Sequence, residues 1–226
     1  MSAGQLTEYA NDIVAVAITA MIISIYHLYL SRVARRSPAA VLSSIATVAR
    51  DAWVESIMAN GDSGLLAIQT LRNSTMAATF LASTAILLML GVLTLSGQGP
   101  GLNESWHYLN VSGSLRPQLW PIKLLTLLLI LFFIFFCFSN SIRILNHVGY
   151  MITIKSNPEH ICFSPKQVSS ELNRGGKYFS LGVRAFYYLV PIVFWLFGPL
   201  YMVGATSILV GIMLPRIDKT PHHPIP

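Results

Sequence analysis

Histidine is the first residue type in this chain whose spacing could hold a cofactor. His27 lies near the end of the apolar run 13–30, and His147 lies beyond the apolar run 119–138. Two histidines on different helices can hold a haem iron or another metal. The depths differ, because His147 lies nine residues, about 14 Å, past its run, while His27 lies within its own. We therefore expect no cofactor, and a haem or metal site at His27 and His147 is the alternative.

A larger set of polar residues could bind an anion. Its members adjoin apolar segments on one side of the expected bundle: His27, Asp51, Glu55, Arg72, Asn73, Arg143, His147 and Arg184. The planar fork of arginine suits phosphate, so one interpretation is a site for an anion or a lipid headgroup. The other interpretation, which we favour, is an ion-pair network that fixes how the helices align.

No catalytic set of residues is evident. The sequence has no HExxH, GxSxG or CxxC pattern, and Arg174–Lys177 (RGGK) lacks the order of a phosphate-binding loop and is interpreted as a hinge. Asp12 is the one acid at an outer edge, and no acid lies deep in an apolar run. Lys123, near the outer end of the third run, is expected to extend toward water. The pattern favours a protein that is neither an enzyme nor an ion-coupled pump.

Composition indicates the elements that must position these residues. Apolar residues make up 54% of the 226 residues and charged residues only 11%, against about 25% charged residues in a soluble domain. Four apolar runs are long enough to cross a bilayer: 13–30, 75–96, 119–138 and 186–214. We predict an all-α integral membrane protein of four transmembrane helices in a single domain, 1–226, with a Pro- and His-rich tail, 215–226, that holds His222 and His223.

Helices are also expected beside and within these runs. After Pro38, an amphipathic helix on the cytoplasmic side is predicted from the spacing of Leu42, Ile45, Ala46, Ala49, Trp53 and Ile57. It could lie in the headgroup layer or pack on the other helices. Residues 65–75 should continue into the second span, where Ser74, Ala78, Ala82 and Ala85 form a small-residue face for packing within the chain. Ser164 should cap a short helix that begins at Pro165.

Basic residues set the orientation. Most of them fall in the segments 31–74 and 139–185, and this excess gives a formal net charge of +6. Cytoplasmic segments of membrane proteins carry such an excess, so we interpret the charge in this way and not as a nucleic-acid site. Both termini are then expected outside, and both segments in the cytoplasm.

Four stretches carry a resemblance to a known family. They are 50–54 (RDAWV), 66–88 (LAIQTLRNSTMAATFLASTAILL), 135–152 (FFCFSNSIRILNHVGYMI) and 182–199 (GVRAFYYLVPIVFWLFGP). They resemble an uncharacterised family of bacteria and plants, domain of unknown function 599. The resemblance implies a multi-pass membrane protein, which we place in a bacterial inner membrane, and it implies no activity, substrate or catalytic residue.

The functional prediction is a non-enzymatic membrane protein that acts as a scaffold or as an accessory subunit of a larger complex. Its partners would be the lipid bilayer and other membrane subunits or further copies of the chain. The alternative is a carrier or channel for a small molecule, an ion or a lipid. An enzyme acting on a lipid headgroup ranks lowest, because no nucleophile and base can be named.

Overall fold

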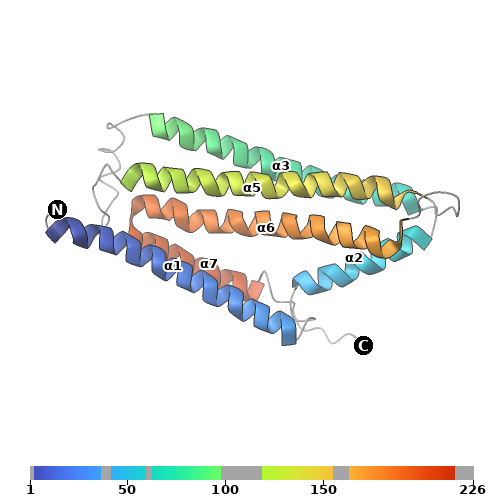
Figure 1. Ribbon diagram of the computed structural model, residues 1–226, viewed down its shortest axis with the longest axis horizontal. Coiled ribbons are helices and arrows are strands. Elements are labelled where there is room, and N and C mark those ends of the chain that lie inside the picture. Colours follow the sequence, from blue (N-terminus) through green and yellow to red (C-terminus); the bar gives the residue numbers. More distant parts are fainter. Residues whose placement is uncertain (1–2, 37–41, 60–62, 98–118, 155–162, 217–226) are drawn as a thin grey trace. The chain divides into compact units, whose positions relative to one another are not determined.

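The computed structural model describes residues 3–36, 42–59, 63–97, 119–154 and 163–216, and this part of the chain is helical without strands (Figure 1). The helices are α1 (Ala3–Arg36), α2 (Leu42–Ala59), α3 (Gly64–Gly97), α5 (Leu119–Ile152), α6 (Pro165–Phe197) and α7 (Pro199–Arg216). The chain divides into two compact units. The terminal unit comprises Met1–Leu42, Leu88–Leu131 and Phe186–Pro226, and the central unit comprises Ser43–Leu87 and Phe132–Ala185.

Four helices in the described residues are long and apolar enough to cross a membrane. They are Ala10–Arg36 of α1 and the whole of α3, α5 and α6. The last three have 33 or 34 residues, about 50 Å at 1.5 Å per residue, whereas the hydrocarbon core of a bilayer is about 30 Å thick. Each therefore extends well beyond its apolar segment. The helices indicate a multi-pass membrane protein.

The fourth apolar run differs from the sequence prediction. Instead of one helix over 186–214, the structure has the end of α6 and a separate helix α7. Gly198 separates them with a φ of 149°, a value that residues other than glycine rarely adopt. Pro199, which lacks an N–H group to donate, then occupies the first position of α7. The glycine and the proline together end one apolar helix and begin another.

α1 and α7 lie side by side in the terminal unit (Figure 1). Ala15 of α1 packs with Met202 of α7, and further along both helices Leu30 packs with Met213. The two helices therefore run parallel. The residues after Arg216, which include the predicted tail with His222 and His223, lie outside the described residues.

α3 buries the small-residue face that its sequence predicted. Ala78, Ala82 and Ala85 are buried, whereas Ser74 is exposed and lies off this face. Six hydroxyl groups of α3 donate to the carbonyl oxygen four residues earlier, and they belong to Thr70, Ser74, Thr75, Thr79, Thr84 and Thr94. A hydroxyl bonded in this way adds no unsatisfied polar group, so an apolar helix can carry it.

α2 is the predicted amphipathic helix, and it packs on the helices of the central unit. Val54 and Ile57 are buried in the core of this unit, with Trp53 and Met58 packed against it. The predicted apolar stripe is wrong at its start, because Leu42 and Ile45 are exposed. The buried side of α2 instead includes the half-buried, polar Arg50, whose partners are described below.

α6 continues through the Gly-Gly pair, so the predicted hinge is wrong. A Cβ atom on Gly175 would lie 3.2 Å from Ile144, and one on Gly176 would lie 2.7 Å from the guanidinium carbon of Arg50. These glycines permit close packing of α5 and α2 on α6. The predicted start of α6 is confirmed, because the Ser164 hydroxyl accepts a hydrogen bond from the Gln167 N–H, and the Gln167 side chain accepts one from the Ser164 N–H. The predicted short length is wrong, because α6 has 33 residues.

Candidate functional site

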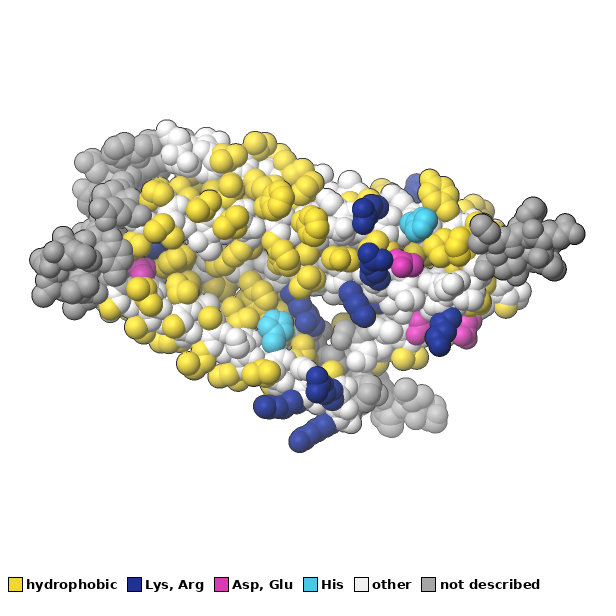
Figure 2. Space-filling view, in the orientation of Figure 1, with side chains coloured by type: hydrophobic (Ala, Val, Ile, Leu, Met, Phe, Trp, Pro, Cys, Tyr) yellow, Lys and Arg dark blue, Asp and Glu magenta, His cyan; other side chains and the backbone are white. Residues whose placement is uncertain are grey.

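A basic cavity of about 400 Å³ lies between α5 and α6 in the central unit. Its basic side chains are Arg143, His147 and Arg174, and its one carboxylate among the lining residues is Glu171. Ile144, Asn146 and Tyr150 complete the lining. Figure 2 shows Lys and Arg side chains gathered beside a His and an acidic side chain over α5 and α6. The cavity can accept an anion.

Sequence spacing explains how α5 and α6 build this cavity. Arg143, His147 and Tyr150 are spaced by four and three residues, so they project from one side of α5. On α6, Glu171 and Arg174 are one turn apart, and each carboxylate oxygen of Glu171 lies 3.4 Å from Arg174 Nη1. This exposed pair leaves Arg143 and His147 without a carboxylate partner in the described part of the chain.

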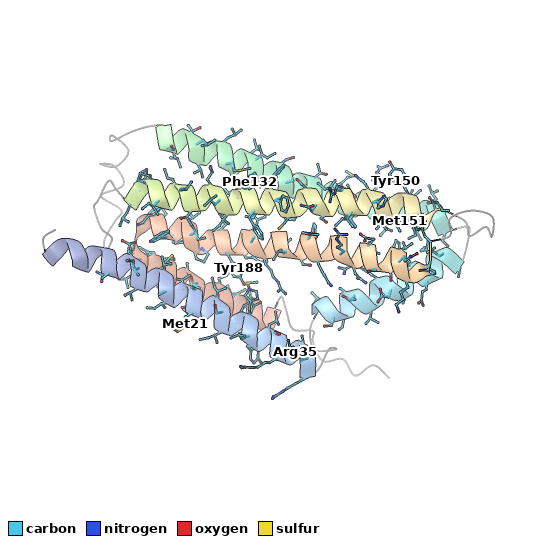
Figure 3. All side chains as sticks on the ribbon, viewed as in Figure 1. Met21, Arg35, Phe132, Tyr150, Met151 and Tyr188 are labelled. Carbon is cyan, nitrogen blue, oxygen red and sulfur yellow. The ribbon has the colours of Figure 1, made fainter. Side chains whose placement is uncertain are left out.

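A second, larger hollow of about 650 Å³ lies between α3 and α5, also in the central unit. Its α3 side is mostly apolar and consists of Ile68, Leu71, Arg72, Thr75, Met76, Thr79 and Phe80. Its α5 side includes Asn146 and Tyr150, which also line the basic cavity. Tyr150, at the end of α5 in Figure 3, is 74% exposed. The two hollows therefore share a wall on α5.

A polar tie joins α2 to α6 in the central unit. Asn173 donates to Asp51 Oδ1 over 2.7 Å and accepts from Arg50 Nη1 over 3.3 Å. Burial lowers the pKa of Arg50, while the negative charge of Asp51 acts to raise it. Arginine does not lose its proton in proteins, so the tie remains charged. The close approach of Gly176 leaves room for the Arg50 guanidinium.

A buried ion pair joins three helices in the terminal unit. Lys123 Nζ of α5 lies 3.6 Å from Asp12 Oδ1 of α1, and both side chains are 5% exposed. Lys123 also donates to the Trp195 carbonyl oxygen of α6 over 3.0 Å, and the Trp195 indole N–H donates to Asp12 over 2.8 Å. The ammonium group lies 5.3 Å from the centre of the indole ring. The prediction that Lys123 extends toward water is wrong, because this closed set of partners holds it inside.

His27 has its partner in the terminal unit as well. Its Nε2 atom lies 2.8 Å from the Tyr188 hydroxyl oxygen of α6, and Figure 3 labels Tyr188 on that helix. The neighbouring Tyr26 is buried, and its hydroxyl group has no hydrogen-bond partner among the described residues. His27 thus makes a contact between α1 and α6.

Across the described helices, no group of three or more His, Cys, Asp or Glu side chains could hold a metal ion. His27 belongs to the terminal unit and His147 to the central unit. The absence of a cofactor therefore stays a prediction.

A family described as "Protein of unknown function, DUF599" matches residues 14–221, nearly the whole chain. The chain belongs to this family. No curated protein and no solved structure matches it.

In this DUF599 chain the predicted polar residues fall into separate places. The structure brings Arg143 and His147 to the basic cavity and Arg72 to the neighbouring hollow. Asp51 joins the tie with Asn173, and His27 contacts Tyr188. Asn73 of α3 and Glu55 of α2 are exposed, and Arg184 of α6 is half-buried.

Sequence reasoning missed several residues of these sites. Lys123 and Asp12 were each recognised near the outer end of a span, and their opposite charges at similar depth were the signal that they pair. Asn173 and Arg174 were missed because they lie in a segment that was interpreted as a short helix followed by a hinge. A 3.6-residue periodicity continued through the two glycines would have placed them on one long helix.

Proposed function

We propose that this DUF599 protein is a non-enzymatic membrane protein that acts as a scaffold or as an accessory subunit of a larger complex, in a bacterial inner membrane. Its work would be to bind other membrane components through a fixed arrangement of helices.

The buried Asp12–Lys123 pair carries this proposal. Each charge already has partners within 3.6 Å, and the Trp195 side chain closes the group. A transport group must be able to change partners, whereas a closed ion pair holds α1, α5 and α6 in one register. Large apolar side chains are exposed on the long apolar helices, where Leu87 of α3 is 68% exposed and Leu129 of α5 is 60% exposed. Such faces contact lipid or other membrane helices.

Site-specific photo-cross-linking in native membranes tests this function. A photoreactive residue at Leu87 or Leu129 should give a discrete protein adduct of higher mass from at least one of the two faces. The same residue at the buried Ala82 is the control and should react only within the chain. Adducts only with lipid at both exposed positions, and a monomer in mild detergent, would contradict the scaffold or subunit role.

A carrier for an anion is the second candidate, and the basic cavity is the observation that favours it. Flux of an anion such as phosphate into vesicles that hold the purified chain tests this candidate. The carrier predicts flux that is lost in Arg143→Ala and retained in Arg35→Ala, which removes a charge on α1 that lies outside the lining of the cavity.

We further propose that the chain crosses the membrane with its N-terminus outside and its C-terminus in the cytoplasm. The parallel packing of α1 and α7 supports this revision of the sequence prediction, because the end of α7 then lies on the same side as Arg32, Arg35 and Arg36. The revision also moves Arg216 and Lys219 to the cytoplasmic side, which the excess of basic residues in cytoplasmic segments favours.

A further inference from the structure

The basic cavity and the neighbouring hollow together have the chemistry of a phospholipid site. The basic cavity offers two arginines and a histidine against one glutamate. The hollow beside it, called the α3–α5 groove from here on, offers Leu71, Met76 and Phe80. Both are lined by Asn146 and Tyr150, so a ligand with an anionic group and an acyl chain can lie across this wall and use both.

Arg143 and Arg72 lie just beyond the ends of apolar runs, at the depth expected of lipid headgroups. Arg143 lies five residues after Phe138, the end of the apolar run, which is about 8 Å along the helix axis. Arg72 lies three residues before Thr75, where the second apolar run begins, about 5 Å away. Arginines just outside a hydrocarbon core are placed to meet phosphate groups.

Arg143 and His147 are exposed, so both are accessible to an anion from outside the chain. Glu171 Oε1 forms an ion pair with Arg174 Nη1 at 3.4 Å. Arg143 and His147 therefore have no carboxylate partner in the described residues. An arginine fork can bind two oxygen atoms of one phosphate. A soluble anion would need the cavity alone and would leave the apolar groove unused.

We propose that the central unit binds an anionic phospholipid of the cytoplasmic leaflet. The phosphate lies against Arg143, His147 and Arg174, and one acyl chain follows the α3–α5 groove past Met76 and Phe80. The site is independent of whether the chain is a scaffold or a carrier.

Binding to the purified full chain in lipid nanodiscs tests the proposal. Short-chain phosphatidic acid, short-chain phosphatidylcholine and inorganic phosphate are added separately, and the shift of the thermal-unfolding midpoint is measured. We expect phosphatidic acid to raise the midpoint in a saturable manner, and phosphatidylcholine and phosphate to leave it unchanged. A shift of equal size with inorganic phosphate would overturn the lipid assignment and indicate a soluble-anion site.

Two pairs of variants separate the two halves of the site. Arg143→Gln with Arg174→Gln should weaken phosphatidic acid binding by roughly tenfold or more, the effect of losing hydrogen bonds to charged groups. Arg35→Gln is its control, a basic residue outside both hollows. Thr79→Trp should fill the groove and weaken the binding of phosphatidic acid. Its control is Leu87→Trp, on an exposed part of α3 outside the groove.

The controls distinguish a specific lipid-binding site from nonspecific electrostatic attraction of an anionic lipid to basic residues. If Arg35→Gln weakened phosphatidic acid binding as much as the double variant, the proposal would be overturned, because any basic residue would then attract the lipid equally. Unchanged affinity in Thr79→Trp would overturn the placement of the acyl chain. If the double variant fails to fold, the comparison of phosphatidic acid with phosphate on the unaltered chain still decides the proposal.

Discussion

Lys123 is an ionisable residue that lies among apolar helices without extending to water. Removing a charge from water is unfavourable unless hydrogen bonds and an opposite charge replace the lost hydration. Here the replacements are the Asp12 carboxylate and the Trp195 carbonyl oxygen. The same residues tie three helices together, so satisfying the charge also fixes the fold.

Substitution of Lys123 by Leu should therefore destabilise the protein strongly. The Asp12 carboxylate would remain buried without its cation, and breaking a buried pair on one side costs about 3–5 kcal/mol. The free energy of unfolding, measured by SDS titration in mixed micelles, checks this. The double variant Asp12→Leu with Lys123→Leu should recover much of the loss, because no unpaired charge stays behind.

The exposed pair of Glu171 and Arg174 provides the comparison. Glu171→Gln should change the free energy of unfolding by less than about 0.5 kcal/mol, since exposed ion pairs contribute little. Equal effects of Lys123→Leu and Glu171→Gln would show that the terminal-unit pair is not buried as described.

Glycines of α6 test the close packing of the central unit. A Cβ atom on Gly182 would lie 2.8 Å from the Phe138 ring, whereas one on Gly91 of α3 would meet nothing within 4 Å. We expect Gly182→Ala to lower the free energy of unfolding by about 1–3 kcal/mol, the usual effect of overpacking. Gly91→Ala should be neutral or slightly stabilising. Thermal-unfolding midpoints of both variants measure the difference, and a neutral Gly182→Ala would contradict the packing of α6 on α5.

At the scale of helices, the apolar runs were sufficient to predict where α1, α3 and α5 lie, because about 20 apolar residues in sequence have few alternatives. Their true ends were not predictable in the same way. α6 begins at Pro165, and its first half is polar and glycine-containing, so no long apolar run marks it as part of a spanning helix. The glycines that suggest a hinge in isolation are explained by Ile144 and Arg50, which lie far away in sequence.

The candidate site was predictable only in part for a related reason. Arg143 and His147 share one side of a helix, so their proximity follows from spacing alone. Their neighbours Glu171 and Arg174 come from another helix, and only tertiary packing shows that they line the same cavity. The eight predicted polar residues were consequently assigned to one network, although the structure distributes them over several contacts.

The turn between α6 and α7 depends on one backbone conformation. Gly198 has a φ of 149°, and a side chain in such a region is strained by about 1–3 kcal/mol. Gly198→Ala should lower the thermal-unfolding midpoint, and Gly204→Ala, where a Cβ atom would meet nothing within 4 Å, should not. A midpoint that is unchanged in Gly198→Ala would contradict the tight turn.

For the whole molecule, the parallel pair of α1 and α7 is the basis of the proposed path of the chain through the membrane. A single helix over 186–214 would leave the C-terminus outside, beside the N-terminus. The turn at Gly198 reverses the chain instead, so that the packing of Met213 on Leu30 brings the end of α7 beside the end of α1. This reversal was not predictable from hydropathy, because both halves of the run are apolar.

Mapping the side of the membrane on which each segment lies is the most direct test of this account. A reporter that is active only outside the cytoplasm is fused after residue 226 and, in separate proteins, inserted within 98–118 and within 37–41. The account predicts activity within 98–118 and none at the other two positions. An active reporter at the C-terminus, or an inactive one within 98–118, would contradict it.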